Sequence, residues 1–107
     1  FSGKVLIRKE AEKAFARQSD KNLLLSEGAR INTKPSLEIF CDDVQATHGA
    51  TAGAVAQDAL FYMMSRGLDE ETARRALVYA FASEIINRVD IKSLWRYLDQ
   101  QFSNPNL

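Results

Sequence analysis

The sequence is poor in the residues that build reactive sites within a single chain. It contains one cysteine and one histidine among 107 residues. A single cysteine cannot form an internal disulfide, so we expect a reducing, cytoplasmic setting. The chain also lacks a paired Cys-x-x-Cys motif, a phosphate-binding glycine loop and a nucleophile elbow. We therefore expect a protein that is not an enzyme.

An excess of charge of either sign is missing as well. Fourteen basic residues balance fourteen acidic ones, which gives no electrostatic reason to expect nucleic acid or an anionic membrane as a partner. No apolar run approaches the ~20 residues of a membrane span. Hydrophobic residues make up 46% and charged residues 26%, a globular composition with room for a modest core.

The first half of the chain predicts short strands broken by corners. Val5 to Ile7 and Ala14 to Arg17 are strand candidates, and residues 19–22 (Ser-Asp-Lys-Asn) predict a turn. Further candidates are centred near Leu24, Ile31, Glu38 and Gln45, about seven residues apart. Because residue 1 is phenylalanine and a strand begins almost at once, we expect the chain to be a piece of a longer protein.

Two architectures suit these short strands. One is an antiparallel sandwich or barrel, which is the more frequent arrangement. The other is a parallel β-helix, in which each strand stacks on its counterpart one coil away. The sequence has no Asn-Gly or Asp-Gly hairpin signal, which favours the β-helix.

The second half predicts three helices. The first runs from about Gln57 to Ser65 and ends at Gly67, a favourable residue just past a helix end. Asp69 is placed to cap a second helix from Glu70 to about Arg88. Asp90 is placed to cap a third, whose apolar positions include Trp95, and residues 104–106 (Asn-Pro-Asn) are expected to end it.

His48 is the sharpest candidate for chemistry. An imidazole can ligate a metal or transfer a proton at neutral pH. The alternative is a histidine that packs at a strand end and bonds to backbone, because one histidine is not a constellation. Both interpretations stay open at the level of the residues.

The neighbours of His48 have plainer explanations. Asp42 and Asp43 are adjacent, so on a strand they point to opposite faces and cannot form a facing acid/base pair. Together with His48 they would give a small metal-dependent hydrolase only with a poor set of ligands. Cys41 falls in step with Leu37 and Ile39 as a small buried hydrophobe, or else it is one thiolate ligand of a shared iron–sulfur site.

Charged residues on the second helix are candidates for partner binding. Glu84 lies among apolar residues, and Arg88 four positions later is placed to pair with it. A salt bridge to a docked protein is the alternative. Arg74 and Arg75 lie on the outward face. We expect these four residues to contribute to a docking surface.

Six segments occur in one order and together resemble the C-terminal part of the SufB/SufD family, the scaffold proteins of Suf iron–sulfur cluster assembly. The segments are residues 22–26 (NLLLS), 33–39 (TKPSLEI), 42–44 (DDV), 48–51 (HGAT), 59–67 (ALFYMMSRG) and 79–84 (YAFASE). The resemblance covers essentially the whole chain. The His-Gly-Ala-Thr segment that begins at His48 resembles the sequence of the D-type subunit at this place.

The resemblance implies a β plus α fold: the end of a right-handed parallel β-helix over residues 1–55, then a C-terminal three-helix domain over residues 56–107. It also implies a scaffold that pairs with a B-type subunit near His48 and docks an ABC-type ATPase through its helices. His48 would contact iron or a nascent cluster shared with the partner. The isolated fragment would bind no cofactor, and the iron–sulfur cluster would be transient in the full complex.

The sequence departs from the family pattern in two informative places. Ala46 stands where relatives commonly have a cysteine, so this chain is not expected to supply a thiolate beside His48. Ala56 replaces an expected acidic cap, so the first helix should fray or begin later. A homodimer of the fragment through its strand edge is a further expectation. The alternative function is a purely structural interaction module with no ligand role for His48.

Overall fold

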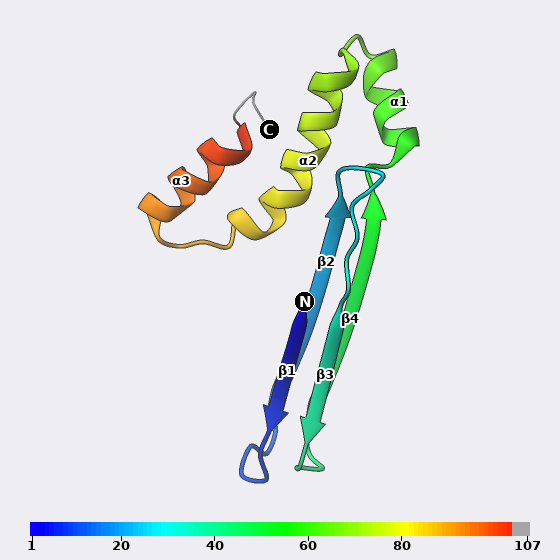
Figure 1. The fold of residues 1–107 in the computed structure, drawn as a ribbon. Helices are drawn as coiled ribbons and strands as arrows, with labels where there is room; N and C mark the ends of the chain where they lie inside the picture. The colour runs from blue at the N-terminus through cyan, green and yellow to red at the C-terminus, as the bar shows by residue number, and fades with distance from the viewer. Residues whose placement is uncertain (104–107) are drawn as a thin grey trace. The chain divides into compact units, whose positions relative to one another are not determined.

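The computed structural model describes residues 1–103 and divides the chain into two compact units, Phe1–Gly53 and the residues from Ala54 onward. Each unit is described by itself. The first contains strands and the second contains helices, which confirms the β plus α class (Figure 1). The elements in chain order are β1 Ser2–Ile7, β2 Phe15–Leu24, β3 Lys34–Ile39, β4 Gln45–Ala54, α1 Gln57–Ser65, α2 Glu70–Ile86 and α3 Lys92–Ser103.

The strands pair two places apart along the chain: β1 with β3, and β2 with β4. β1 lies beside β3 in parallel, from Ser2 beside Lys34 to Ile7 beside Ile39. The N–H of Phe40 donates to the carbonyl of Ile7 at 2.9 Å and extends this ladder. β2 neighbours β4, and Figure 1 shows the strands of each pair running in the same direction. Antiparallel pairing is therefore wrong for β1 and β3.

The pairing repeats along the chain at about 30 residues, a length typical of one structural repeat. The expected spacing of about seven residues between successive strands is thus not the period that stacks them. Each sheet contains two strands within the described part of the chain. The arrangement seen is a pair of short, open parallel sheets.

β2 runs through the segment that the sequence predicts as a turn. Asp20 and Asn22 lie within the strand, half-buried, and both have partners from distant segments. The hydroxyl of Thr33 donates to the Asp20 carboxylate, and the Asn22 amide donates to the carbonyl of Thr51 at 3.1 Å. These partners satisfy polar side chains that would otherwise favour a turn. Residues 30–33, predicted as a strand, are irregular.

The helices begin and end close to the predicted positions. α1 starts at Gln57 although Ala56 provides no side-chain cap, so the expectation of a later start is wrong. Gly67 has a φ of 99°, the left-handed conformation expected after a helix end. The Asp69 carboxylate accepts the N–H of Thr72 at 2.9 Å and caps α2.

The last two helices differ from the prediction by one or two residues. α2 ends at Ile86, before Arg88. The first backbone bond of α3 runs from Trp95 N–H to the Ile91 carbonyl at 2.9 Å, so the cap position falls on Ile91 and not on Asp90. The predicted end of this helix at residues 104–106 lies outside the described residues. None of the described helices is long and apolar enough to cross a membrane.

Buried apolar side chains are few in both units. Leu60 and Val55 are each 5% exposed, and Ala73 is fully buried. Ile7 and Ile86 complete the buried set among the described residues. Large apolar side chains at the surface include Phe61, which is 74% exposed.

Candidate functional site

The Cys41–Thr51 stretch forms the corner between β3 and β4 and then most of β4. His48 lies in the middle of β4 with its side chain exposed to solvent. Asp42 and Asp43 form the corner and are exposed, while Cys41 is half-buried. Among the residues from 1 to 103, no three histidine, cysteine or acidic side chains gather as a group able to hold a metal ion.

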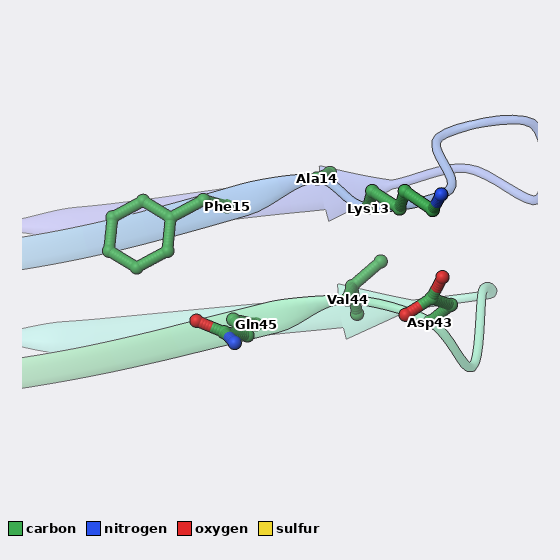
Figure 2. Close-up of a pocket in the computed structure, with 6 residues that line it drawn as sticks. All are labelled: Lys13, Ala14, Phe15, Asp43, Val44 and Gln45. Carbon is green, nitrogen blue, oxygen red and sulfur yellow. The ribbon is translucent and has the colours of Figure 1, made fainter.

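A pocket of about 390 Å³ lies where β2 and β4 begin (Figure 2). Its lining includes the side chains of Lys13, Phe15, Asp43 and Gln45. The backbone joins its two sides, since Lys13 N–H donates to the Asp43 carbonyl at 2.6 Å. The pocket thus includes one of the two aspartates but not His48, so the structure does not bring the predicted Asp-Asp-His set together there.

The backbone bonds fix which residues of β2 and β4 lie side by side. In a parallel pair, the carbonyl of a residue accepts from the residue after its neighbour. The Ala14 carbonyl accepts the N–H of Gln45 at 3.0 Å, so Ala14 lies beside Val44. From this bond we infer that the same register continues along both strands, which would place Gln18 beside His48.

Three further observations agree with this register. β2 and β4 each contain 10 residues and are coextensive under it. The Asn22 amide reaches the Thr51 carbonyl, close to where the register predicts. Ala16 and Ala46, which become neighbours, are both half-buried, whereas the residues next to them are exposed. Gln18 and His48 therefore belong to one row of side chains on the same face of the two strands.

Gln18 is the residue that the sequence interpretation missed. Its Oε1 atom is shielded from solvent and has no hydrogen-bond partner among the described residues. A Cβ at Gly3 would collide with its Nε2 atom, so the glycine leaves room for the amide. The alternation of Gln18, Asp20 and Asn22 is the signal that predicts polar side chains on one strand face.

The Asp20 carboxylate has its own partners. The Thr33 hydroxyl donates to it, and with the Asn22 amide this lowers the pKa of Asp20 below its ordinary value. The group is therefore ionised at neutral pH. The hydrogen bond links the Asp20 carboxylate on β2 to Thr33, the residue before β3.

The charged candidates on α2 are placed as follows. Arg75 donates to Glu71 at 2.9 Å, a pair one helical turn apart, so it already has a partner within the helix. Arg74 is half-buried and Glu84 is exposed. Arg88 is exposed and lies two residues beyond the end of α2.

The polar contact that joins α2 to α3 was also missed. The Tyr79 hydroxyl donates to the Asp99 carboxylate at 2.6 Å. This bond raises the pKa of the Tyr79 hydroxyl, with smaller contributions from burial and from the aspartate charge. Because the pair is 20 positions apart, no helical spacing predicts it.

Comparison with known proteins identifies the class. Residues 1–81 match the family model described as "SUF system FeS cluster assembly, SufBD core domain". The chain is 47% identical over 100 residues to an iron–sulfur cluster assembly SufBD family protein of Synechocystis, covering 94% of this chain and 22% of that protein. It is 44% identical over 88 residues to a chloroplastic protein of Arabidopsis thaliana, covering 82% of this chain and 18% of the relative.

A third relative is the iron–sulfur cluster assembly protein SufD of Escherichia coli. It is 39% identical over 85 residues, covering 79% of this chain and 20% of that protein. The chain thus spans about a fifth of the length of these relatives. It belongs to the SufBD family of iron–sulfur cluster assembly proteins, which confirms the resemblance drawn from the sequence.

Proposed function

We propose that the chain is part of a D-type scaffold subunit in iron–sulfur cluster assembly, without catalytic residues of its own. Its strands would be the last coils of a right-handed parallel β-helix, and its helices would be a docking domain. The boundary would lie at residues 55–56. The observation that carries the proposal is parallel pairing of strands two apart, within a chain that the SufBD core model matches over residues 1–81.

His48 is the residue proposed to meet the iron or nascent cluster, which is the substrate of the assembly. It is exposed on β4, where an incoming chain could reach it. A neutral imidazole is a good ligand for iron, and a partner's thiolate would supply the softer ligation. Because this chain gathers no metal-binding group of its own in residues 1–103, the site would be completed by a B-type subunit.

The helical unit is proposed to dock an ABC-type ATPase. Exposed apolar side chains on α1 and α3, such as Phe61 at 74% and Tyr97 at 59%, would supply contact area. Arg74, Glu84 and Arg88 would add charged contacts at the rim. Arg75 would take part only by exchanging its bond to Glu71.

A cytoplasmic location is proposed for this scaffold, although the Arabidopsis relative is chloroplastic. Pairing of two copies of the chain through the strand edge competes with the B-type subunit in this proposal. The alternative function is an interaction module in which His48 only packs; its exposed side chain argues against that role.

The test replaces His48 with alanine in the full-length subunit, co-expressed with a B-type subunit and the ATPase. We expect His48→Ala to lower the yield of iron–sulfur cluster while the complex elutes unchanged from size exclusion. Thr47→Ala is the matched control, because Thr47 is exposed on the opposite face of β4. Unchanged cluster yield in His48→Ala would reject the ligand role and leave the interaction module.

A further inference from the structure

The row that Gln18 and His48 share contains few polar atoms that could bond to the imidazole. On β4 the residues at neighbouring positions of this row are Ala46 and Ala50. On β2 they are Ala16 and Asp20, and the Asp20 carboxylate accepts from Thr33. Gln18 lies directly beside His48 in the register, one row position nearer than Asp20, and its Oε1 atom accepts no hydrogen bond in residues 1–103.

The amide of Gln18 packs against Gly3, and its oxygen has no hydrogen-bond partner among the described residues. Gly3 on β1 leaves the space that its Nε2 atom occupies, since a Cβ at Gly3 would collide with that atom. Its Oε1 atom is shielded from water and accepts no hydrogen bond in residues 1–103. A shielded acceptor without a donor is costly, so a nearby N–H would be bound favourably.

We propose that Gln18 is a positioning residue for His48, which it orients by accepting the N–H of the neutral imidazole. This inference rests on the proposed ligand role of His48. Rotation of the exposed His48 side chain toward Gln18 would form this hydrogen bond. The other ring nitrogen would then carry its lone pair away from Gln18, available to iron or a cluster.

The chemistry requires such a partner. A neutral imidazole has one N–H and one lone pair, and the bond made by the first decides which nitrogen offers the second. Histidine ligands of metals usually donate their other N–H to an oxygen acceptor, which fixes the tautomer and ring orientation. A glutamine Oε1 is such an acceptor, and it adds no charge beside the ligand.

The tautomer of His48 tests the proposal without any metal. His48 is the only histidine of the chain, so ¹⁵N-histidine labelling gives ring signals of this residue alone. We expect the wild-type chain, at a pH where the ring is neutral, to show one dominant tautomer. Gln18→Met keeps the length of the side chain but removes the acceptor, and it should give the mixture of an unconstrained imidazole.

Two further variants separate positioning from general disturbance. Gln18→Glu keeps an acceptor and should restore one dominant tautomer. Gln45→Met removes a glutamine from the exposed face of β4 and should leave the wild-type spectrum. An unchanged tautomer in folded Gln18→Met overturns the proposal. If circular dichroism shows that Gln18→Met does not fold, the wild-type spectrum decides, because a mixture of tautomers in the wild-type chain also overturns the proposal.

The result is distinguishable from failure of the proposed function. Lower cluster yield in His48→Ala, with no effect of Gln18→Met on the tautomer, would keep the ligand role and reject Gln18 as its positioner. A tautomer that depends on Gln18, with normal cluster yield in His48→Ala, would leave the hydrogen bond as a structural contact. It would reject the ligand role on which the inference rests.

Discussion

Gly3→Ala should expose how tightly the Gln18 amide is held. The new methyl carbon would collide with Gln18 Nε2 and would meet the Phe1 ring at 2.5 Å, far inside van der Waals contact. Both contacts are movable side-chain ends, so the cost is at the low end for overpacking, about 1 kcal/mol. Displacing the Gln18 amide relieves the clash, which couples the two positions.

The coupling is measured by a double-mutant cycle with Gln18→Ala. With the amide removed, only the contact with the Phe1 ring remains, so Gly3→Ala should destabilise less. Restriction of the unfolded chain offsets about 0.4–1 kcal/mol of the cost in both backgrounds. That contribution cancels in the cycle, so we expect a coupling free energy of about 0.5–1 kcal/mol, from the clash with the amide alone, within the range for residues in contact. Urea unfolding of the four proteins, followed by far-UV circular dichroism, gives the values. Equal effects of Gly3→Ala in both backgrounds would refute the close approach.

Three further predictions concern the helical unit. Leu60→Ala should lower the free energy of unfolding by about 2–5 kcal/mol because the side chain is buried, whereas Phe61→Ala, at a position 74% exposed, should have little effect in the same urea titration. The hydrogen bond that Asp69 accepts as a cap lowers the pKa of its carboxyl below 3.8, so the stabilisation from this bond is present above that pH and lost as pH falls through the folded pKa. Asp69→Asn should flatten this acid dependence of thermal unfolding. The pKa of Tyr79 is raised from 10.0, so the stabilisation from its bond to Asp99 is present below that pH and lost as pH rises through the folded pKa. Tyr79→Phe should remove this alkaline dependence of thermal unfolding. An unchanged pH profile of thermal unfolding in Tyr79→Phe would contradict the bond.

The helices could be predicted because their signals are local. A capping aspartate, a glycine after the helix end and apolar residues at helical spacing act within a few positions of one another. Asp69 and Gly67 accordingly mark the ends of helices in the structure as they do in the sequence. The small errors are of one or two residues. The second helix ends before Arg88, and the cap of the third helix falls on the residue after Asp90.

The strands could be predicted only in part because their partners are distant. Asp20 and Asn22 have turn-forming side chains, yet residues Thr33 and Thr51 satisfy them within a long strand. No single sequence shows that pairing in advance. The sequence singles out His48 because it is the one histidine, whereas its neighbour Gln18 follows only from the register inferred between β2 and β4.

The family could be identified from the sequence because the six segments are distributed over almost the whole chain. The match of residues 1–81 to the SufBD core model and the SufD relative of Escherichia coli confirm it. Partners and the role of His48 remain predictions, since the chain covers about a fifth of each relative.

The most direct test of the central claim asks whether His48 nitrogen touches the cluster. The full-length subunit is labelled with ¹⁵N-histidine, assembled with unlabelled B-type subunit and ATPase, loaded with cluster and reduced. Pulsed electron paramagnetic resonance then detects any ¹⁵N coupled to the electron spin. We predict a ¹⁵N coupling that disappears in His48→Ala and persists in Thr47→Ala. A loaded cluster with no ¹⁵N coupling, or with a coupling unchanged by His48→Ala, would contradict the account.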